Sequence, residues 1–382
     1  MIRKKLNILI LSPFFSPNTG GVETHLDDLC AYLVKRNHKV AVITYKPLTT
    51  KAAAKIFERK GNLKIYRVPW FGKTLFHRFE EHPVFQFLYL TPGLFLASLL
   101  YFIKNHERID AVHAHGFTAA LITNWLNSLY HGKRLIVSMH AIYRLGEKTY
   151  LALICRQILK SFHRIFCLAE VSRQDLIAAK VQANKLNVYV QWVDQSNFRP
   201  RDKSKARQKI GLANKFTVLF VGRLITKKGV NVLAAAAKKL PRVNFIFVGD
   251  GPWQTKGRKL AIKYKNIILV GRQSPNKVAY YYNAADITAV PSQYPEGFAR
   301  VVLESLSSGT PVLAASNGCL PEMITDQVGR LIEPDSLNYY KQIKLFQKNP
   351  DKLQALAKNC RPYAENRFSQ KHALTIEKSY YW

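Results

Sequence analysis

Acidic residues are scarce in this chain of 382 residues, which has 24 Asp and Glu against 58 Lys and Arg. The net charge of +34 is shared by both halves, with +16 in residues 1–200 and +18 in residues 201–382, so it is not a basic tail. Such an excess predicts anionic partners: nucleic acid, phosphorylated ligands or acidic lipid. The sequence lacks the aromatic repeats and the recognition helix typical of nucleic-acid-binding proteins, so we expect no nucleic acid and keep that class as an alternative.

Cysteine is also sparse and scattered. The five cysteines include no CxxC pair, which argues against a disulfide framework or a zinc site and favours a reducing, cytoplasmic setting. The N-terminal apolar run, residues 6–11, is too short for a signal peptide, contains Asn7 and precedes no small-residue cleavage site. We therefore predict a buried first strand there.

One uncharged run, residues 83–103, is long enough to span a bilayer. Pro92 and Gly93 lie in its middle and predict two shorter helical pieces, each too short to cross. A buried or membrane-facing helix pair is the favoured interpretation, and a transmembrane helix is the alternative.

Short apolar runs alternate with amphipathic stretches along most of the chain, which predicts βαβ units and parallel sheets. A single core stops growing near roughly 250–300 residues, so we expect two domains. A polar, basic stretch interrupts the alternation and predicts a linker over residues 196–215, between an N-terminal domain (1–195) and a C-terminal domain (216–360). Ligands of such sheets bind beyond the carboxyl ends of the strands, and with two domains we expect the site in the cleft between them. The predicted strands are 7–11, 39–44, 108–115, 134–140, 164–169, 216–222, 243–249, 266–271, 286–292 and 310–315.

Two loops carry features suited to phosphate. Gly20 and Gly21 precede a predicted helix, where a glycine loop lets phosphate approach backbone N–H groups, although a tight turn is the alternative. The loop is neither GxGxxG nor a Walker motif, which argues against NAD or ATP. Arg223 and Lys228 follow a predicted strand and could clamp a diphosphate, Arg as a planar fork and Lys as a point charge.

Two acids stand eight residues apart, Glu296 and Glu304. On one helix they would lie about 12 Å apart along the axis, which is too far for the carboxylate pair of a glycosidase, roughly 5–9.5 Å. They are better placed to touch two parts of one long ligand. The alternative is structural: Glu296 would favour the dipole at a helix start, and Glu304 would be solvated.

Several motifs together resemble glycosyltransferase family 4, and the resemblance covers nearly the whole chain. They are GGVETH (20–25), HAHG (113–116), VSMHA (137–141), VGRL…KKG (221–229), VGDGP (248–252) and PSxxxEGFxxVxLExxxxGxPVxAxxxGxxPE (291–322). The resemblance implies a retaining, metal-independent enzyme of the α/β GT-B fold, with two Rossmann-like doubly wound parallel-sheet domains facing a central cleft. It also implies a C-terminal helix, residues 361–382, that packs back on the N-terminal domain. The opening SPFFSPNTGGVETHL is similar to the subgroup that makes glycosylated inositol phospholipids.

The resemblance implies a role for each matching residue. Glu296 would contact the hydroxyls of the donor sugar, Glu304 the nucleotide ribose, and His140 the reacting sugar. Arg223 and Lys228 would neutralise the donor diphosphate, with the glycine loop near its β-phosphate. The implied catalytic residues are Glu296, His140, Arg223 and Lys228, and the implied donor-binding residues add Gly20, Gly21, Gly297, Phe298, Ala299 and Glu304.

The sequence departs from the family pattern in two places. The usual Asn-Gly-Val-Asp near the linker is Gln191-Trp192-Val193-Asp194, which bears on the packing of the hinge. The usual Gly-Gly before the Pro-Glu pair is Gly318-Cys319, which makes loop 316–321 less flexible. Neither departure removes an implied catalytic group.

Four histidines raise the question of a metal: His113, His115, His131 and His140. HxH on a strand points both side chains to one face, but no carboxylate or cysteine cluster completes a coordination shell. We expect no metal and no cofactor, since the nucleotide sugar is a substrate. We place His115, with Arg144, on the acceptor side.

The sequence therefore predicts a hexosyl- or N-acetylhexosaminyl-type transferase (EC 2.4) with a nucleotide-sugar donor and a lipid-linked or other membrane-associated glycan acceptor. The charge and the apolar segment predict a cytoplasmic protein, peripheral on the inner face of an anionic membrane. The alternatives are a GT-B enzyme with a small soluble acceptor, a nucleotide-sugar epimerase, and the basic nucleic-acid-binding protein considered above.

Overall fold

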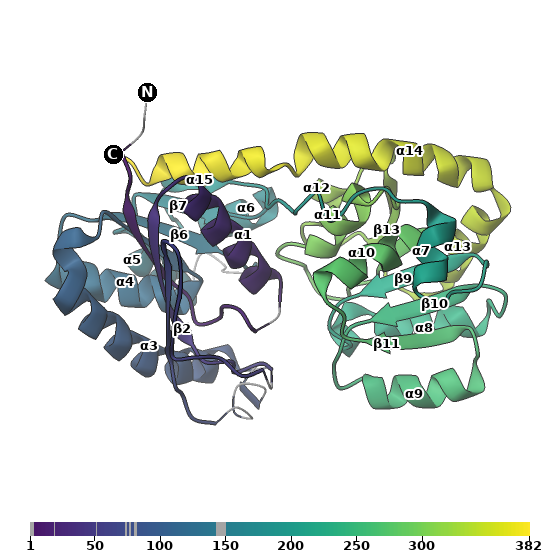
Figure 1. The fold of residues 1–382 in the computed structure, drawn as a ribbon, viewed down its shortest axis with the longest axis horizontal. Helices are drawn as coiled ribbons and strands as arrows, with labels where there is room; N and C mark the ends of the chain where they lie inside the picture. The colour runs from purple at the N-terminus through teal and green to yellow at the C-terminus, as the bar shows by residue number, and fades with distance from the viewer. Residues whose placement is uncertain are drawn as a thin grey trace. The chain divides into compact units, whose positions relative to one another are not determined.

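The chain folds into two compact units, each built on its own sheet (Figure 1). The computed structural model describes residues 4–18, 20–50, 52–72, 75, 78–79, 82–142 and 150–382. Unit 1 comprises Met1–Gln191 and Lys371–Trp382, and unit 2 comprises Trp192–Gln370. The predicted α/β class with two doubly wound parallel sheets is confirmed.

Unit 1 contains an eight-stranded sheet in the order β3-β4-β2-β1-β5-β6-β7-β8, parallel except for β3 at one edge. The sequence does not predict β3, β4 and β8, because these strands are short or charged and show no apolar run. The strands are β1 (Asn7–Leu11), β2 (Lys39–Tyr45), β3 (Phe57–Lys60), β4 (Leu63–Val68), β5 (Ala111–His115), β6 (Arg134–Met139), β7 (Arg164–Cys167) and β8 (Leu186–Val188).

Helices cover the sheet of unit 1, so its central strands are buried on both faces and consist of near-continuous apolar residues. In Figure 1, α3, α4 and α5 lie together at the left, and α1 lies beside α15. The described helices are α1 (Gly21–Lys35), α3 (Pro83–Asn105), α4 (Phe117–Leu129), α5 (Tyr150–Leu159), α6 (Glu170–Ala178) and α15 (Ala373–Ser379).

The prediction of two helical pieces within residues 83–103 is wrong, because α3 continues through Pro92. The Tyr45 hydroxyl inserts at the break: it accepts a hydrogen bond from Leu94 N–H (2.7 Å) and donates one to the Leu90 carbonyl (2.8 Å). The hydroxyl thus bridges the Leu90 carbonyl and Leu94 N–H, the two groups that would otherwise pair directly in the helix, and α3 continues past this point. Gly93 permits this approach, since a Cβ there would lie 2.9 Å from the Tyr45 oxygen and 2.5 Å from the Trp70 ring.

Unit 2 contains a six-stranded parallel sheet in the order β11-β10-β9-β12-β13-β14. The strands are β9 (Thr217–Val221), β10 (Asn244–Val248), β11 (Ile267–Gly271), β12 (Ile287–Val290), β13 (Val312–Ala315) and β14 (Gly329–Ile332). The helices are α7 (Lys203–Lys209), α8 (Val230–Lys238), α9 (Gln254–Lys263), α10 (Pro275–Ala284), α11 (Arg300–Ser307), α12 (Leu320–Met323), α13 (Ser336–Lys348) and α14 (Pro350–Arg367).

The segments at the predicted boundaries have structure of their own. Residues 196–215 belong to unit 2 and contain α7, whose first turn is capped by the Asp202 carboxylate accepting from Lys205 N–H (2.7 Å). Within the stretch 361–382, residues 361–367 end α14 in unit 2, whereas α15 belongs to unit 1.

Candidate functional site

The predicted diphosphate and carboxylate residues of unit 2 follow two neighbouring strands. Arg223 and Lys228 come after β9, and Glu296 comes after β12, which pairs with β9 in parallel. The strand order reverses at this pair, since β10 and β11 lie on one side and β13 and β14 on the other. Such a switch point opens a crevice at the carboxyl ends of the strands, where α/β proteins bind ligands.

Lys228 and Glu296 form a close ion pair. The Lys228 ammonium donates to both carboxylate oxygens of Glu296, at 2.6 and 2.8 Å. Glu296, which is 3% exposed, also accepts from the hydroxyls of Ser292 and Tyr294, the latter at 3.0 Å. Burial disfavours the charged Lys228, but the negative charge of Glu296 and the hydrogen bonds to Glu296 and Tyr294 outweigh it and raise the pKa of Lys228.

Two glycines hold this pair in place. Gly229 has φ of 75°, and a Cβ there would overlap the Pro291 carbonyl oxygen. Gly318 has φ of 60°, and a Cβ there would overlap the backbone of Glu296. Two backbone hydrogen bonds join the same segments, from Gln293 N–H to the Lys227 carbonyl (2.8 Å) and from Cys319 N–H to the Glu296 carbonyl (2.9 Å). The carboxylate therefore sits on a braced loop, as a precise site requires.

Glu304 lies within α11, whereas Glu296 lies in the loop that precedes this helix. The carboxylate of Glu304 accepts from the Tyr282 hydroxyl at 2.9 Å and pairs with Arg300 one turn earlier at 3.4 Å. Its side chain is 14% exposed, so the solvated alternative does not describe it. Burial and the charge of Glu304 both raise the pKa of Tyr282, which keeps that hydroxyl protonated as a donor.

The remaining predicted residues of unit 2 flank the pair. Arg223 is exposed in the turn between β9 and the 3₁₀ turn Thr226–Lys228. Gly297 and Phe298 are half-buried in the loop before α11, and the buried Ala299 is the residue at its N-cap.

In unit 1 the predicted residues follow β1, β5 and β6, and β1 and β5 pair where the order of that sheet reverses. Gly21 begins α1, with Gly20 before it. A Cβ on Gly21 would meet no atom within 4 Å, so packing does not require glycine there.

His115 ends β5, and His140 comes directly after β6. Nδ1 of His115 and Nε2 of His140 lie 2.9 Å apart, so one nitrogen donates to the other. Burial lowers the pKa of His140 to about 4, and burial with the neighbouring histidines lowers the pKa of His115 well below its ordinary value. Both rings are neutral at pH 7.

His113 extends this cluster toward the C-terminal segment. Its Nδ1 lies 2.7 Å from the Tyr380 hydroxyl and its Nε2 lies 2.9 Å from the Ser138 hydroxyl. Burial lowers the pKa of His113 to about 3. Among the described residues no group of three or more His, Cys, Asp or Glu could hold a metal ion. Arg144, which is expected on the acceptor side, lies outside the described residues.

Sequence reasoning missed three residues that hold the two acids: Ser292, Tyr294 and Tyr282. Ser292 and Tyr294 stand inside the PSQYPEG stretch, where two hydroxyls just before an acid were an available signal. Tyr282 lies 22 residues before Glu304, and no pattern in the sequence pointed to it.

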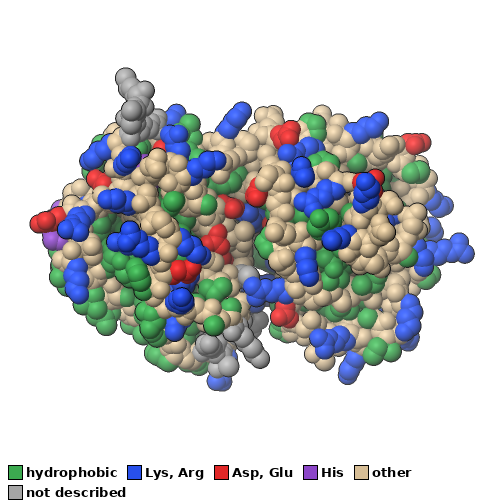
Figure 2. Space-filling model, in the orientation of Figure 1, with side chains coloured by type: hydrophobic (Ala, Val, Ile, Leu, Met, Phe, Trp, Pro, Cys, Tyr) green, Lys and Arg blue, Asp and Glu red, His purple; other side chains and the backbone are tan. Residues whose placement is uncertain are grey.

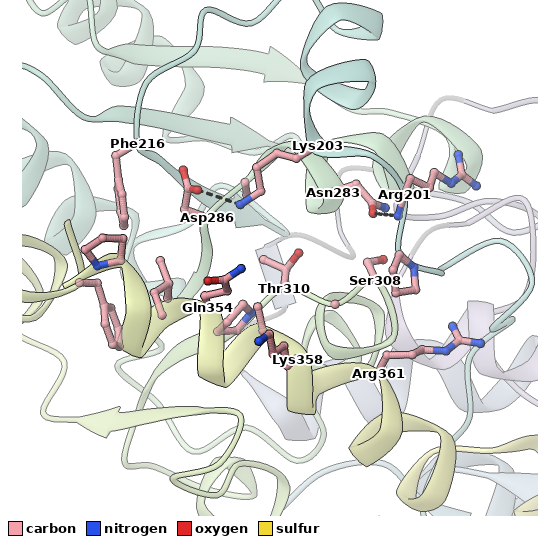
Figure 3. A pocket seen from close by; sticks show the side chains of 18 of the residues that line it. Arg201, Lys203, Phe216, Asn283, Asp286, Ser308, Thr310, Gln354, Lys358 and Arg361 are labelled. Carbon is pink, nitrogen blue, oxygen red and sulfur yellow. Dashed lines mark hydrogen bonds and ion pairs between the residues drawn. The ribbon is translucent and has the colours of Figure 1, made fainter. Parts of the chain in front are cut away.

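A separate pocket of about 590 Å³ opens at the opposite ends of these strands (Figure 3). Its lining includes Phe216, Asp286 and Pro311, which directly precede β9, β12 and β13. Two of the basic side chains that line it make bonds within unit 2: Lys203 pairs with Asp286 at 2.8 Å, and Arg361 donates to three backbone carbonyls. This pocket contains none of the predicted site residues.

Known proteins share both halves of this architecture. The family model for Glycosyltransferase Family 4 matches residues 19–196, and the model for Glycosyl transferases group 1 matches residues 202–366. A subunit of phosphatidylinositol N-acetylglucosaminyltransferase from Arabidopsis thaliana is 25% identical over 342 residues, covering 87% of this chain and 72% of that protein. A D-inositol 3-phosphate glycosyltransferase from Segniliparus rotundus is 27% identical over 356 residues, covering 84% and 75%.

The fold matches that of solved structures over its full length. The sucrose-phosphate synthase of Thermosynechococcus elongatus superposes with a TM-score of 0.81 at 19% identity, covering 98% of each chain. The two family matches together span most of the sequence, and the fold agrees with them. The chain belongs to glycosyltransferase family 4.

Proposed function

We propose that this glycosyltransferase moves a sugar from a nucleotide-sugar donor to a hydroxyl of an inositol-containing phospholipid, with retention of configuration. The Lys228–Glu296 pair at the switch point of unit 2 carries this proposal, because it brings a cation suited to a diphosphate next to a buried carboxylate that could accept from sugar hydroxyls. Glu304, farther along in α11, would accept hydrogen bonds from the ribose of the nucleotide.

We propose that catalysis depends on positioning the two substrates and on stabilising the charge of the leaving group. The bond from the anomeric carbon to the β-phosphate oxygen breaks, and the acceptor oxygen bonds to that carbon from the same face. The departing phosphate oxygen takes the proton of the acceptor hydroxyl. Lys228 and Arg223 would stabilise the negative charge that develops on the leaving group, and no divalent metal is needed for this role.

Two relatives suggest the acceptor. One is named for transfer to phosphatidylinositol and the other for transfer to D-inositol 3-phosphate, so both names specify an inositol ring that bears phosphate. The shared acceptor chemistry is a phosphoinositol, and the excess of basic residues suits its charge. Because a phospholipid acceptor stays in the bilayer, we further propose a cytoplasmic enzyme that is peripheral on the inner face of the membrane.

The donor is tested by thermal unfolding with UDP-, GDP- and ADP-sugars. A ligand at a hundred times its dissociation constant should stabilise the protein by about 2.7 kcal/mol. Glu304→Ala should weaken this shift for the matching donor, because a ribose contact exists in the ground state as well as the transition state. The control is Tyr282→Phe, which removes the hydrogen bond to Glu304 but keeps the carboxylate.

The acceptor is tested by transfer to short-chain phosphatidylinositol, with phosphatidylcholine as the negative control and with and without EDTA. The proposal predicts transfer to the inositol lipid alone and no loss with EDTA. Transfer that requires added Mg²⁺ would show that the mechanism depends on a metal. A protein that neither binds nor turns over any nucleotide sugar would contradict the proposed function.

A further inference from the structure

The outer face of α3 is apolar over its whole length. Its exposed side chains follow one helix face, with the spacing of three and four residues that such a face requires. Leu88, Leu96 and Leu100 are 59%, 57% and 53% exposed, although an outward face is normally polar. The stripe is about 27 Å long at 1.5 Å per residue. It consists of Phe85, Leu88, Pro92, Leu96, Leu100 and Ile103.

The neighbouring helices enlarge this surface. α3 packs against α4, and α4 packs against α5; the rings of Phe95 and Trp125 meet edge to face across the first contact. Figure 2 shows hydrophobic side chains gathered over the part of unit 1 where Figure 1 draws α3 and α4. Large apolar residues are exposed on α4 and α5 as well: Trp125, Leu129, Tyr150, Leu151, Leu153 and Ile154. Together with the α3 stripe they form the "α3–α5 surface".

Basic residues predominate at the edges of this surface. As bounded in the structure, α3, α4 and α5 contain no Asp or Glu. Exposed Lys104 lies in the last turn of α3. Exposed Arg156 lies in the last turn of α5, and exposed Lys160 directly follows that helix; Glu107 is an acid just beyond α3. Apolar side chains bordered by basic groups are typical of proteins that lie in the interface of an anionic bilayer.

The opposite face of α3 argues against a helix that crosses a membrane. By length and composition one described segment, Val84–Arg108, could span a bilayer. However, Leu90, Leu94 and Phe102 are buried in the core of unit 1, and the helix depends on the Tyr45 hydroxyl of β2. A crossing helix would have to give up this packing.

We propose that the α3–α5 surface docks unit 1 on an anionic lipid bilayer, with the apolar side chains in the headgroup region and the basic residues against lipid phosphates. A bilayer fits better than a protein partner because the surface combines a long apolar stripe, aromatic residues and basic edges on helices without acids. The inference rests on the proposed function, whose acceptor is a membrane lipid, and it names the surface that brings the enzyme to that lipid.

The test is flotation with vesicles of phosphatidylcholine containing phosphatidylserine, compared with phosphatidylcholine alone. The double variant Leu96→Asp/Leu100→Asp should reduce binding to anionic vesicles at least about tenfold, because each buried leucine contributes that much or more. The matched control is Ile262→Asp/Leu345→Asp, which places the same charges at exposed apolar positions of unit 2 and should bind as wild type. Arg156→Ala/Lys160→Ala should weaken binding about fivefold per residue at low salt.

A second measurement locates the contact. All five native cysteines are buried, so a cysteine introduced as Leu100→Cys can be labelled selectively with an environment-sensitive dye. The dye should report an apolar environment when anionic vesicles are added, and a dye at Ile262→Cys should not.

Three outcomes would overturn the inference: wild-type protein that does not float, a Leu96→Asp/Leu100→Asp variant that floats normally, or a wild-type dimer that this variant converts to monomers without any vesicle binding. The last would make the surface a protein interface. Failure of the proposed function can be distinguished from failure of this inference. A protein that binds no nucleotide sugar can still float with vesicles through the α3–α5 surface. Conversely, transfer to short-chain acceptor without flotation would remove only this inference.

Discussion

Glu296 and Lys228 form a largely buried ion pair, and each neutralises the charge of the other. Their catalytic and structural roles can therefore be separated only by comparing single variants with the double variant. Glu296→Gln should lower turnover at least about 100-fold, and it should also destabilise the protein, by about 3 kcal/mol, because the Lys228 ammonium loses its partner. Adding Lys228→Met should restore most of the stability and none of the activity.

Chemical denaturation and transfer rates of the two single variants and the double variant make this comparison. A single Glu296→Gln variant with wild-type turnover would remove Glu296 from the catalytic residues. A double variant that recovers turnover would show that the pair serves only the fold.

The histidine cluster predicts a loss of stability in acid. The pKa values of His113 and His140 are lowered to about 3 and about 4, below the ordinary value of about 6.5 that an unfolded chain would show. The unfolded chain therefore takes up protons first as the pH falls, so the free energy of unfolding should decrease from about pH 6.5 downward toward pH 4.

The contribution of one ring can be measured by denaturation at pH 7.5, 6.0 and 5.0. His115→Phe should reduce the pH dependence by about 1.4 kcal/mol per pH unit below pH 6. Equal slopes for wild type and His115→Phe would contradict the burial of a neutral ring.

At the scale of elements, α3 tests how a helix survives an internal proline. Tyr45→Phe keeps the ring but removes the buried hydroxyl that bonds both Leu94 N–H and the Leu90 carbonyl, which should cost about 1–3 kcal/mol. Pro92→Ala should not destabilise, because Pro92 is exposed and the tyrosine bridge does not depend on it. Amide exchange across α3 is the measurement, and undiminished protection in Tyr45→Phe would refute the bridge.

Elements with strong apolar runs are predictable from the sequence, and elements that depend on distant partners are not. The runs 7–11 and 39–44 match β1 and β2 almost residue for residue. β4 escapes prediction because it carries Arg67, whose guanidinium is buried through contacts with Glu58 and the Ser16 carbonyl. The continuity of α3 escapes prediction because its rescue comes from Tyr45, 45 residues from the carbonyl that it caps.

The same distinction applies to the candidate site. Glu296 and Glu304 stand in one dense motif, so their importance is visible in the sequence. The direct hydrogen bond between Lys228 and Glu296 cannot be predicted from the sequence. It joins residues 68 apart and forms only when β9 and β12 pair. The sequence alone assigns these two residues to different parts of the ligand.

At the scale of the whole molecule, the last residues of the chain complete unit 1. Glu377 is 1% exposed and bonds Tyr32, Arg36 and His38, while Tyr380 reaches His113. Burial alone would raise the pKa of Glu377, but the hydrogen bonds from Tyr32 and His38 and the charge of Arg36 lower it overall.

Deleting residues 371–382 should therefore destabilise unit 1 by several kcal/mol, on the order of 4 from the lost burial of Ile376 and Tyr380 alone. Hydrogen exchange with peptide resolution should show protection lost in β1, β5 and α1 and unchanged in β9 and β12. Uniform loss in both units, or no loss, would contradict a C-terminal segment that belongs to unit 1.

The proposed function depends on sugar transfer with retention to an inositol lipid, so the stereochemistry of one product is its decisive test. The donor identified by thermal unfolding is incubated with short-chain phosphatidylinositol, and the anomeric configuration of the glycolipid is determined by NMR. We expect a new glycosidic bond to the inositol ring with the same anomeric configuration as the donor. An inverted product, or sugar attached only to other acceptors, would contradict the proposed function.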